Sequence, residues 1–400
     1  MAVATSTTRV RSWARLDGVD ILRGLAILFV LLNHVNMRLF IAQVPYTVGL
    51  PDQWVSSLLW NGQYGVQMFF AVSGFLITST TLRRWGSLSN VSVRDFYLLR
   101  FARIAPLLLL LLAILSALHA ADLKDFVVSA NTGGLGRALV AALTFHVNVL
   151  EARRGYLPGS WDVLWSLSVE EMFYLFFPLV CWLLGRGRLL LGLLLVFVVL
   201  GPFARTVLAQ GNEVWRECSY LGGMDAIALG CLTAIVLSRT RLLRSVLRIL
   251  AGLGTAVLIF SLGFSIRADA WGLGRSGLDM TILAIGTCMV VAWAEQTGWR
   301  SPRVIFPLLK LGRLSYEVYL THMFVVFALF GLFVAAGKPL PGVPILFVAT
   351  ILIAGLLGEL VARFYSEPVN RRLRKYWGDG PKKLGSVIDA TSEGFLISSR

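Results

Sequence analysis

The chain has 400 residues, of which 56% are hydrophobic and 15% are charged, and its mean hydropathy is +0.73. These values exclude an ordinary soluble globular protein and fit a chain that spends most of its length in lipid. The formal net charge of +15 does not indicate a nucleic-acid partner, because the basic residues form short runs between apolar segments, a pattern that orients membrane helices.

Ten apolar windows predict ten transmembrane helices and therefore an all-α polytopic membrane protein. The windows lie near residues 20–40, 63–82, 104–119, 167–184, 189–209, 219–238, 249–266, 277–294, 314–335 and 343–363. With ten crossings, every arginine-rich connection and both termini fall on the cytoplasmic side. A weaker window at 137–150 would invert everything after it if it crossed, so we predict a re-entrant or peripheral segment there.

The ends of the chain differ in composition from its middle. The first apolar window follows a polar, arginine-containing start and has no small-residue cleavage site after it, so we interpret it as an uncleaved signal anchor. We divide the chain into a cytoplasmic N-terminus (1–15), a membrane domain (16–377) and a cytoplasmic tail (378–400) that we expect to be disordered.

One arginine and one histidine, Arg23 and His34, lie eleven residues apart in the first window. On a helix their side chains project only about 20° apart around the axis and roughly 16 Å apart along it. An ionisable group inside a membrane is costly unless it faces a polar interior, so the pair indicates a functional site. The alternative is that Arg23 extends to the near interface and His34 is a packed, hydrogen-bonded residue.

Basic side chains gather near the predicted cytoplasmic side. Arg100 and Arg103 share a helix face in FYLLRFARIAP, and Lys310, Arg313 and Tyr316 lie near the start of a later window. Arginine binds phosphate oxygens bidentately, so this basic mouth suits a phosphate-bearing cytoplasmic ligand. The positive-inside rule alone is the alternative explanation.

Acidic residues fall toward the predicted outer side. In GSWDVLWSLSVEEMFYLFFP, Ser166, Glu170 and Tyr174 share one stripe, whereas Glu171 points about 100° away. A carboxylate beside a histidine fixes its tautomer, so we predict that Glu170 orients His34 as a general base for a hydroxyl. Alternatively, Glu170 is simply a carboxylate near a helix N-terminus.

Other polar residues are less specific signals. His322, in LSYEVYLTHMF, either lines the same cavity, which we favour, or bonds across helices. Ser73 is interpreted as a packing residue, because no GxSxG elbow surrounds any serine. The cysteines show neither CxxC nor metal-type spacing, so we predict no metal site and interpret them as packing residues: Cys181, Cys218, Cys231 and Cys288.

Seven stretches, taken in order, resemble the acyltransferase-3 family of membrane acyltransferases. They are LDGVDILRGLAILFVLLNH, FFAVSGFLIT, FYLLRFARIAPL, WSLSVEEMFYLFFP, MDAIALGCL, LGRLSYEVYLTHMF and YSEPVNRRLR, and together they span residues 16–374. The resemblance implies a ten-helix fold, an acyl-CoA donor taken from the cytoplasm and O-acylation of a hydroxyl acceptor. It also implies that the essential R-x10-H pair is Arg23 and His34, that the family's acidic position is Glu170, and that Arg100 and Arg103 help to hold the CoA phosphates.

We therefore predict a multi-pass inner-membrane O-acyltransferase that moves an acyl group, acetyl by default, from acyl-CoA to a hydroxyl of a glycan, lipid-linked or small-molecule acceptor. Acyl-CoA is a co-substrate, and no further cofactor is predicted. The predicted catalytic residues are His34 and Glu170, and the predicted substrate-binding residues are Arg23, Arg100, Arg103, Glu171, Tyr316 and His322. The alternative from another class is a transporter or flippase with a buried His/Arg/Glu relay, although no internal repeat is visible. A non-catalytic scaffold is disfavoured by so many ionisable groups at depth.

Overall fold

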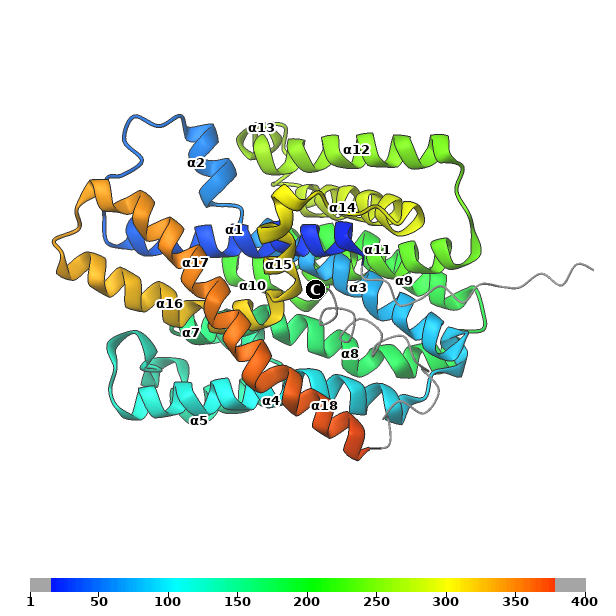
Figure 1. The fold of residues 1–400 in the computed structure, drawn as a ribbon, viewed down its shortest axis with the longest axis horizontal. Coiled ribbons are helices and arrows are strands. Elements are labelled where there is room, and N and C mark those ends of the chain that lie inside the picture. The colour runs from blue at the N-terminus through cyan, green and yellow to red at the C-terminus, as the bar shows by residue number, and fades with distance from the viewer. Residues whose placement is uncertain (1–15, 378–400) are drawn as a thin grey trace, which may run out of the picture.

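The computed structural model describes residues 16–377, which form helices and contain no strand (Figure 1). Most of the long helices lie roughly along one axis of the view, and α17 and α18 cross them obliquely. The predicted N-terminal segment (1–15) and tail (378–400) lie outside the described residues. The α-helices are α1 Asp17–Ile41, α2 Asp52–Leu59, α3 Gly62–Trp85, α4 Val93–Ala120, α5 Gly134–Leu143, α6 Val147–Arg154, α7 Gly159–Asp162, α8 Leu164–Leu184, α9 Leu189–Arg205, α10 Glu213–Cys218, α11 Tyr220–Arg239, α12 Arg244–Gly263, α13 Ser265–Ala270, α14 Leu278–Thr297, α15 Phe306–Arg313, α16 Ser315–Ala335, α17 Val343–Val361 and α18 Glu367–Tyr376.

Short turns of tighter or wider helix complete the described chain. The 3-10 segments are Leu88–Asn90, Lys124–Phe126, Ala130–Thr132, Arg303–Ile305 and Leu340–Gly342, and a π-helical turn at Ala362–Ser366 joins α17 to α18.

Nine helical segments of the described chain are long and apolar enough to cross a membrane, or ten if a bent pair is counted as one span. The nine segments correspond, to within a few residues at their ends, to nine of the ten predicted windows, which confirms the all-α polytopic fold. The remaining window, 189–209, corresponds to α9, an apolar helix of only 17 residues. If α9 crosses as well, these helices make the ten crossings that the sequence predicts.

The bent pair lies where the sequence predicts a re-entrant or peripheral segment. Lys124–Thr132 and Gly134–Leu143 meet at 95°, the geometry of a broken span or a re-entrant loop. The weak window at 137–150 begins inside the second half of this pair and continues into α6. Gly133 joins the two halves with a φ of 105°, a conformation that glycine adopts without strain.

The arginine-rich connections meet at one end of the bundle, which we call the basic end. Here the C-terminus of α14 contacts both α3 and the α11–α12 connection, because Glu295 lies 3.3 Å from Arg83 and Gln296 donates to the Thr240 carbonyl oxygen at 2.7 Å. The α11–α12 connection runs along the right-hand side of Figure 1. Under the positive-inside rule this end faces the cytoplasm, an orientation that stays a prediction.

The connections without this arginine excess meet at the opposite end, which we call the far end. There α2 packs against the α12–α13 junction, with Gln53 donating to the Gly263 carbonyl oxygen at 2.8 Å. Arg38, near the end of α1, forms a 2.6 Å ion pair with Asp125.

Glycines allow close helix contacts that position the site. A Cβ atom on Gly74 of α3 would overlap the Ile227 carbonyl oxygen of α11, and one on Gly312 of α15 would overlap the Asp20 carbonyl oxygen of α1. Small residues permit such approaches between membrane helices. The second contact holds the start of α16 against the first turns of α1.

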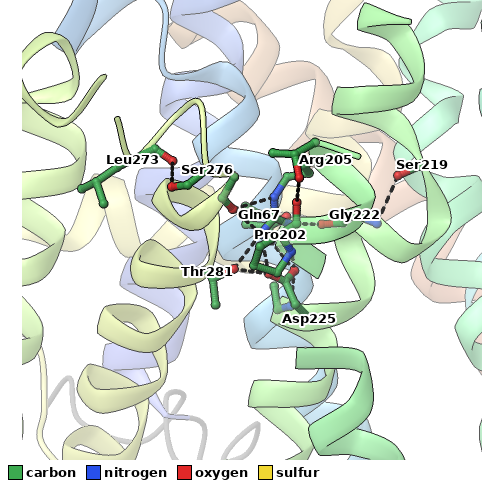
Figure 2. Close-up of polar contacts among 12 residues, drawn as sticks. Gln67, Pro202, Arg205, Ser219, Gly222, Asp225, Leu273, Ser276 and Thr281 are labelled. Atoms are coloured by element: carbon green, nitrogen blue, oxygen red, sulfur yellow. Dashed lines mark hydrogen bonds and ion pairs between the residues drawn. The ribbon is translucent and has the colours of Figure 1, made fainter. Parts of the chain in front are cut away.

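A buried ion pair joins α3, α9, α11 and α14 (Figure 2). Arg205 Nη2 lies 2.7 Å from Asp225 Oδ2, and the two side chains are 7% and 0% exposed. Gln67 and Thr281 donate to the same carboxylate at 2.9 and 2.5 Å. Arg205 also donates to the carbonyl oxygens of Gly222 and Gly277. Each charge is therefore surrounded by hydrogen-bond partners, as burial requires.

Candidate active site

A cavity of about 530 Å³ lies among α1, α3, α4, α8 and α16. We call it the main cavity. Its volume is typical of small-molecule sites. Six of the eight residues predicted from the sequence line it, namely Arg23, Arg100, Arg103, Glu170, Glu171 and Tyr316.

Arg23 projects from α1 into the main cavity. Its Nη2 donates to Ser315 Oγ of α16 at 2.8 Å, and its Nη1 lies 3.8 Å from Asp20. The Asp20–Arg23 pair is long, and Arg313 Nε lies closer to the Asp20 carboxylate, at 3.1 Å. A guanidinium has five N–H donors, so Arg23 keeps donors for a ligand.

Arg100 and Arg103 of α4 have different surroundings in the same cavity. Arg103 forms a 2.7 Å ion pair with Glu317 and lies 4.9 Å from the centroid of the Tyr316 ring. Arg100 forms no ion pair within residues 16–377, and its guanidinium lies 4.7 Å from the Tyr174 ring centroid. Arg100 is therefore the arginine of this pair whose charge is better placed to hold an anionic ligand.

Two neighbouring glutamates of α8 face the same cavity. Glu170 accepts a 2.5 Å hydrogen bond from Ser73 of α3 and a second bond from Tyr174. Glu171 Oε1 is buried and has no hydrogen-bond partner among the described residues. A buried unpaired carboxylate oxygen is costly, so Glu171 is poised to accept an N–H or O–H of a ligand.

Ser73 takes a role that the sequence did not reveal. It was predicted to be a packing residue, yet it lines the main cavity and donates to Glu170. Its position in the middle of an apolar span was the available signal, but a mid-span serine is also typical of helix packing.

His34 and His322 form a pair that does not line the main cavity. Each histidine places Nδ1 against a carbonyl oxygen of its own helix, His34 at 2.8 Å from Val30 O and His322 at 2.7 Å from Tyr319 O. A ring nitrogen contacts a carbonyl oxygen by donating, so Nδ1 of a neutral His34 carries the hydrogen and Nε2 carries the lone pair. His34 is partly exposed, whereas His322 is fully buried with its Nε2 3.4 Å from His34 Nδ1.

The predicted contact between His34 and Glu170 is replaced by other contacts. Glu170 bonds Ser73 and Tyr174, and the groups that hold the His34 ring are the Val30 carbonyl and His322. The expected division of acid outside and base inside is also too coarse, because both glutamates of α8 share a cavity with the arginines.

Tyr319 connects the main cavity to the histidine pair. Its ring lines the cavity, and its centroid lies 5.8 Å from that of His322. Its hydroxyl is 2.6 Å from Ser166 Oγ. The Tyr319 ring therefore separates the main cavity from the two histidines.

Comparison of the sequence with known proteins places the chain in a family. The family described as Acyltransferase domain (acyltransferase-3) matches residues 16–359. The O-acetyltransferase OatA of Staphylococcus aureus (strain NCTC 8325 / PS 47) is 23% identical over 395 residues, which cover 92% of this chain and 60% of that protein. The OatA of strain MRSA252 is 23% identical over 393 residues, with 92% and 59% covered.

The chain thus spans about 60% of the length of these relatives. No solved structure matches it. Because the family match extends over most of the chain and includes every residue of the main cavity and the histidine pair, this multi-pass membrane protein belongs to the acyltransferase-3 family.

Proposed function

We propose that the protein transfers an acyl group, acetyl by default, from acyl-CoA to a hydroxyl of a cell-envelope glycan or a similar acceptor. The observation that carries the proposal is an arginine-lined cavity whose wall residue Tyr319 contacts His322, which in turn lies 3.4 Å from His34, a histidine whose Nδ1 is held by the Val30 carbonyl so that its Nε2 carries the lone pair. The names of the two relatives, both O-acetyltransferases, agree with this reaction.

The donor enters from the basic end, which the positive-inside rule assigns to the cytoplasm. Arg23 and Arg100 hold its polar groups, and Arg103 does so while paired with Glu317. Glu171 accepts an N–H of the donor through its unpartnered oxygen, and Tyr316 lines the same wall. The thioester end then reaches past Tyr319 toward the histidine pair.

His34 serves as the general base in this proposal. Its Nε2 takes the proton of the acceptor hydroxyl, the hydroxyl oxygen bonds to the thioester carbonyl carbon, and the carbon–sulfur bond breaks. The CoA thiolate leaves and receives the proton from the imidazolium, so His34 returns to its neutral form. A variant of this path passes the acyl group through a transient acyl-histidine. His322 positions the His34 ring in both cases.

The reaction is tested with the purified full chain in detergent, labelled acetyl-CoA and extracted envelope glycans. We expect release of free CoA and transfer of the label to glycan. If the protein neither binds acetyl-CoA nor releases CoA, the proposal fails, and a transporter that uses the same buried charges becomes the better interpretation.

Arg23→Gln is expected to raise the KM for acetyl-CoA by about 10- to 100-fold with little change in kcat. Hydrogen bonds to charged groups contribute about 1.5–3 kcal/mol, and Arg23 contacts the donor in this proposal. Initial rates measured over a range of acetyl-CoA concentrations check the expectation. Arg372→Gln, on the exposed face of α18, is the matched control. An unchanged dependence on acetyl-CoA concentration would exclude Arg23 from donor binding.

A further inference from the structure

A second cavity of about 530 Å³ opens at the basic end among α3, α9, α11 and the α11–α12 connection. Two of its lining residues, Ser79 and Arg83 of α3, also line the main cavity. The two cavities therefore meet along the last turns of α3. A ligand that occupied both cavities would therefore extend beyond the main cavity.

The rim of the second cavity is basic and rich in hydroxyl groups. Three arginines line it against a single carboxylate, that of Glu295, which lies 3.3 Å from Arg83. The other two arginines, Arg239 and Arg241, are exposed and make no ion pair or hydrogen bond within the described chain. Hydroxyl groups are contributed by Ser79, Ser87, Ser238 and Thr240.

The floor of the second cavity is apolar. It is formed by Phe75 of α3, Leu190 of α9 and Ile235 of α11, all of them buried. The positive-inside rule accounts for arginines at this end, but it does not require them to surround an apolar recess. An apolar floor beneath a basic rim suits a flat ring that carries phosphate groups at its edge.

Coenzyme A has its charges at one end. The 3′-phosphate and the diphosphate surround the adenosine, whereas the pantetheine arm is uncharged and ends at the sulfur that carries the acyl group. The two adjoining cavities give each end of CoA a separate place, since the second cavity has two unpaired arginines over an apolar floor and the main cavity extends to Tyr319, whose ring centroid lies 5.8 Å from that of His322.

We propose that the second cavity binds the 3′-phosphoadenosine end of the acyl-CoA donor, with Arg239 and Arg241 on the 3′-phosphate. This inference rests on the proposed function and assigns a subsite to it. The diphosphate passes Ser79 and Arg83, where the cavities meet, and the pantetheine arm occupies the main cavity. Arg100 and Arg103 are then available to the diphosphate from α4.

The test measures binding, so it does not depend on turnover. The purified full chain is placed in phosphatidylcholine nanodiscs, and the affinities for CoA and for 3′-dephospho-CoA are measured by calorimetry. We expect the wild type to bind CoA at least about tenfold more tightly, because the 3′-phosphate adds charge-assisted contacts. In Arg239→Gln/Arg241→Gln this preference should disappear, with the affinity for 3′-dephospho-CoA unchanged.

The matched control is Arg244→Gln/Arg248→Gln. It removes two exposed arginines of α12 near the same end that line neither cavity, and it should keep the preference for CoA. Equal wild-type affinities for the two ligands, or a preference that survives in Arg239→Gln/Arg241→Gln, would overturn the proposal.

A phospholipid headgroup also carries a phosphate group. A second measurement distinguishes a lipid ligand from CoA. If phosphatidylglycerol raises the melting temperature of the wild type but not of Arg239→Gln/Arg241→Gln, and the CoA preference is the same in both, the cavity belongs to a lipid and the proposal is wrong. Failure of the proposed function looks different. If the wild type prefers CoA but transfers no acetyl group, the subsite proposal stands and the proposed function is wrong.

Discussion

His34→Ala is expected to lower the rate of acetyl transfer by about 10²- to 10⁴-fold, the usual contribution of a positioned general base. The protein should still fold, because His34 is partly exposed and its Nδ1 bond to the Val30 carbonyl lies within one turn of α1. The measurement is acceptor-dependent CoA release by purified protein. Size-exclusion behaviour and CoA affinity, which the substitution should leave unchanged, report on folding and on the donor site.

Two further variants separate the base from a structural role of this side chain. His34→Asn keeps a donor near the Val30 carbonyl but removes the lone pair of Nε2, so its loss should match that of His34→Ala. His146→Ala changes a histidine at the start of α6 that lines neither cavity, and it should retain wild-type activity. Substantial turnover by His34→Asn would mean that another group takes the proton.

Arg205→Met is expected to lower the free energy of unfolding by about 3–5 kcal/mol, the typical cost of leaving one member of a buried ion pair without its partner. The Asp225 side chain is 0% exposed, and after the substitution Gln67, Thr281 and its own helix are its remaining partners. Reversible unfolding in mixed detergent micelles, followed by circular dichroism, measures the change.

Arg216→Met is the matched control for this stability prediction. Arg216 lies 3.7 Å from Glu217, but both side chains are about half exposed, at 55% and 46%, so its loss should cost less than about 1 kcal/mol. Arg205→Met/Asp225→Leu removes both charges and should recover part of the stability that the single variant loses. If Arg205→Met is as stable as the control, the pair does not hold the four helices together.

Hydropathy and charge were sufficient to predict the long helices, because each long apolar window must satisfy its backbone hydrogen bonds within itself. They also predicted that 137–150 is re-entrant or peripheral, since an additional crossing would have placed arginines on both sides; the bend of 95° between Thr132 and Gly134 lies just before this window. The same periodicity put Arg23, Arg100 and Glu170 among the candidate residues. All three line the main cavity.

The contacts between helices were not predictable in this way. Which residue Glu170 bonds depends on how α8 packs against α3, and helical periodicity says nothing about that packing, so Ser73 was misinterpreted. Arg205 lies at the end of α9 and its partner Asp225 lies on another helix, so no local pattern in the sequence reveals the pair. The second cavity was hidden for the same reason, because its arginines come from segments that each satisfy the positive-inside rule separately.

The length of α9 has a consequence for the surrounding lipid. If α9 crosses the membrane, its 17 residues extend only about 26 Å, whereas the hydrocarbon core of a typical bilayer is about 30 Å thick. Such hydrophobic mismatch is relieved when the bilayer thins locally or when flanking basic side chains reach toward the headgroups. Leu190, in the first turn of α9, lies on the floor of the second cavity. Longer acyl chains in the host membrane would increase the mismatch and therefore strain the wall of that cavity. The shape of the second cavity would then depend on the lipid composition of the membrane.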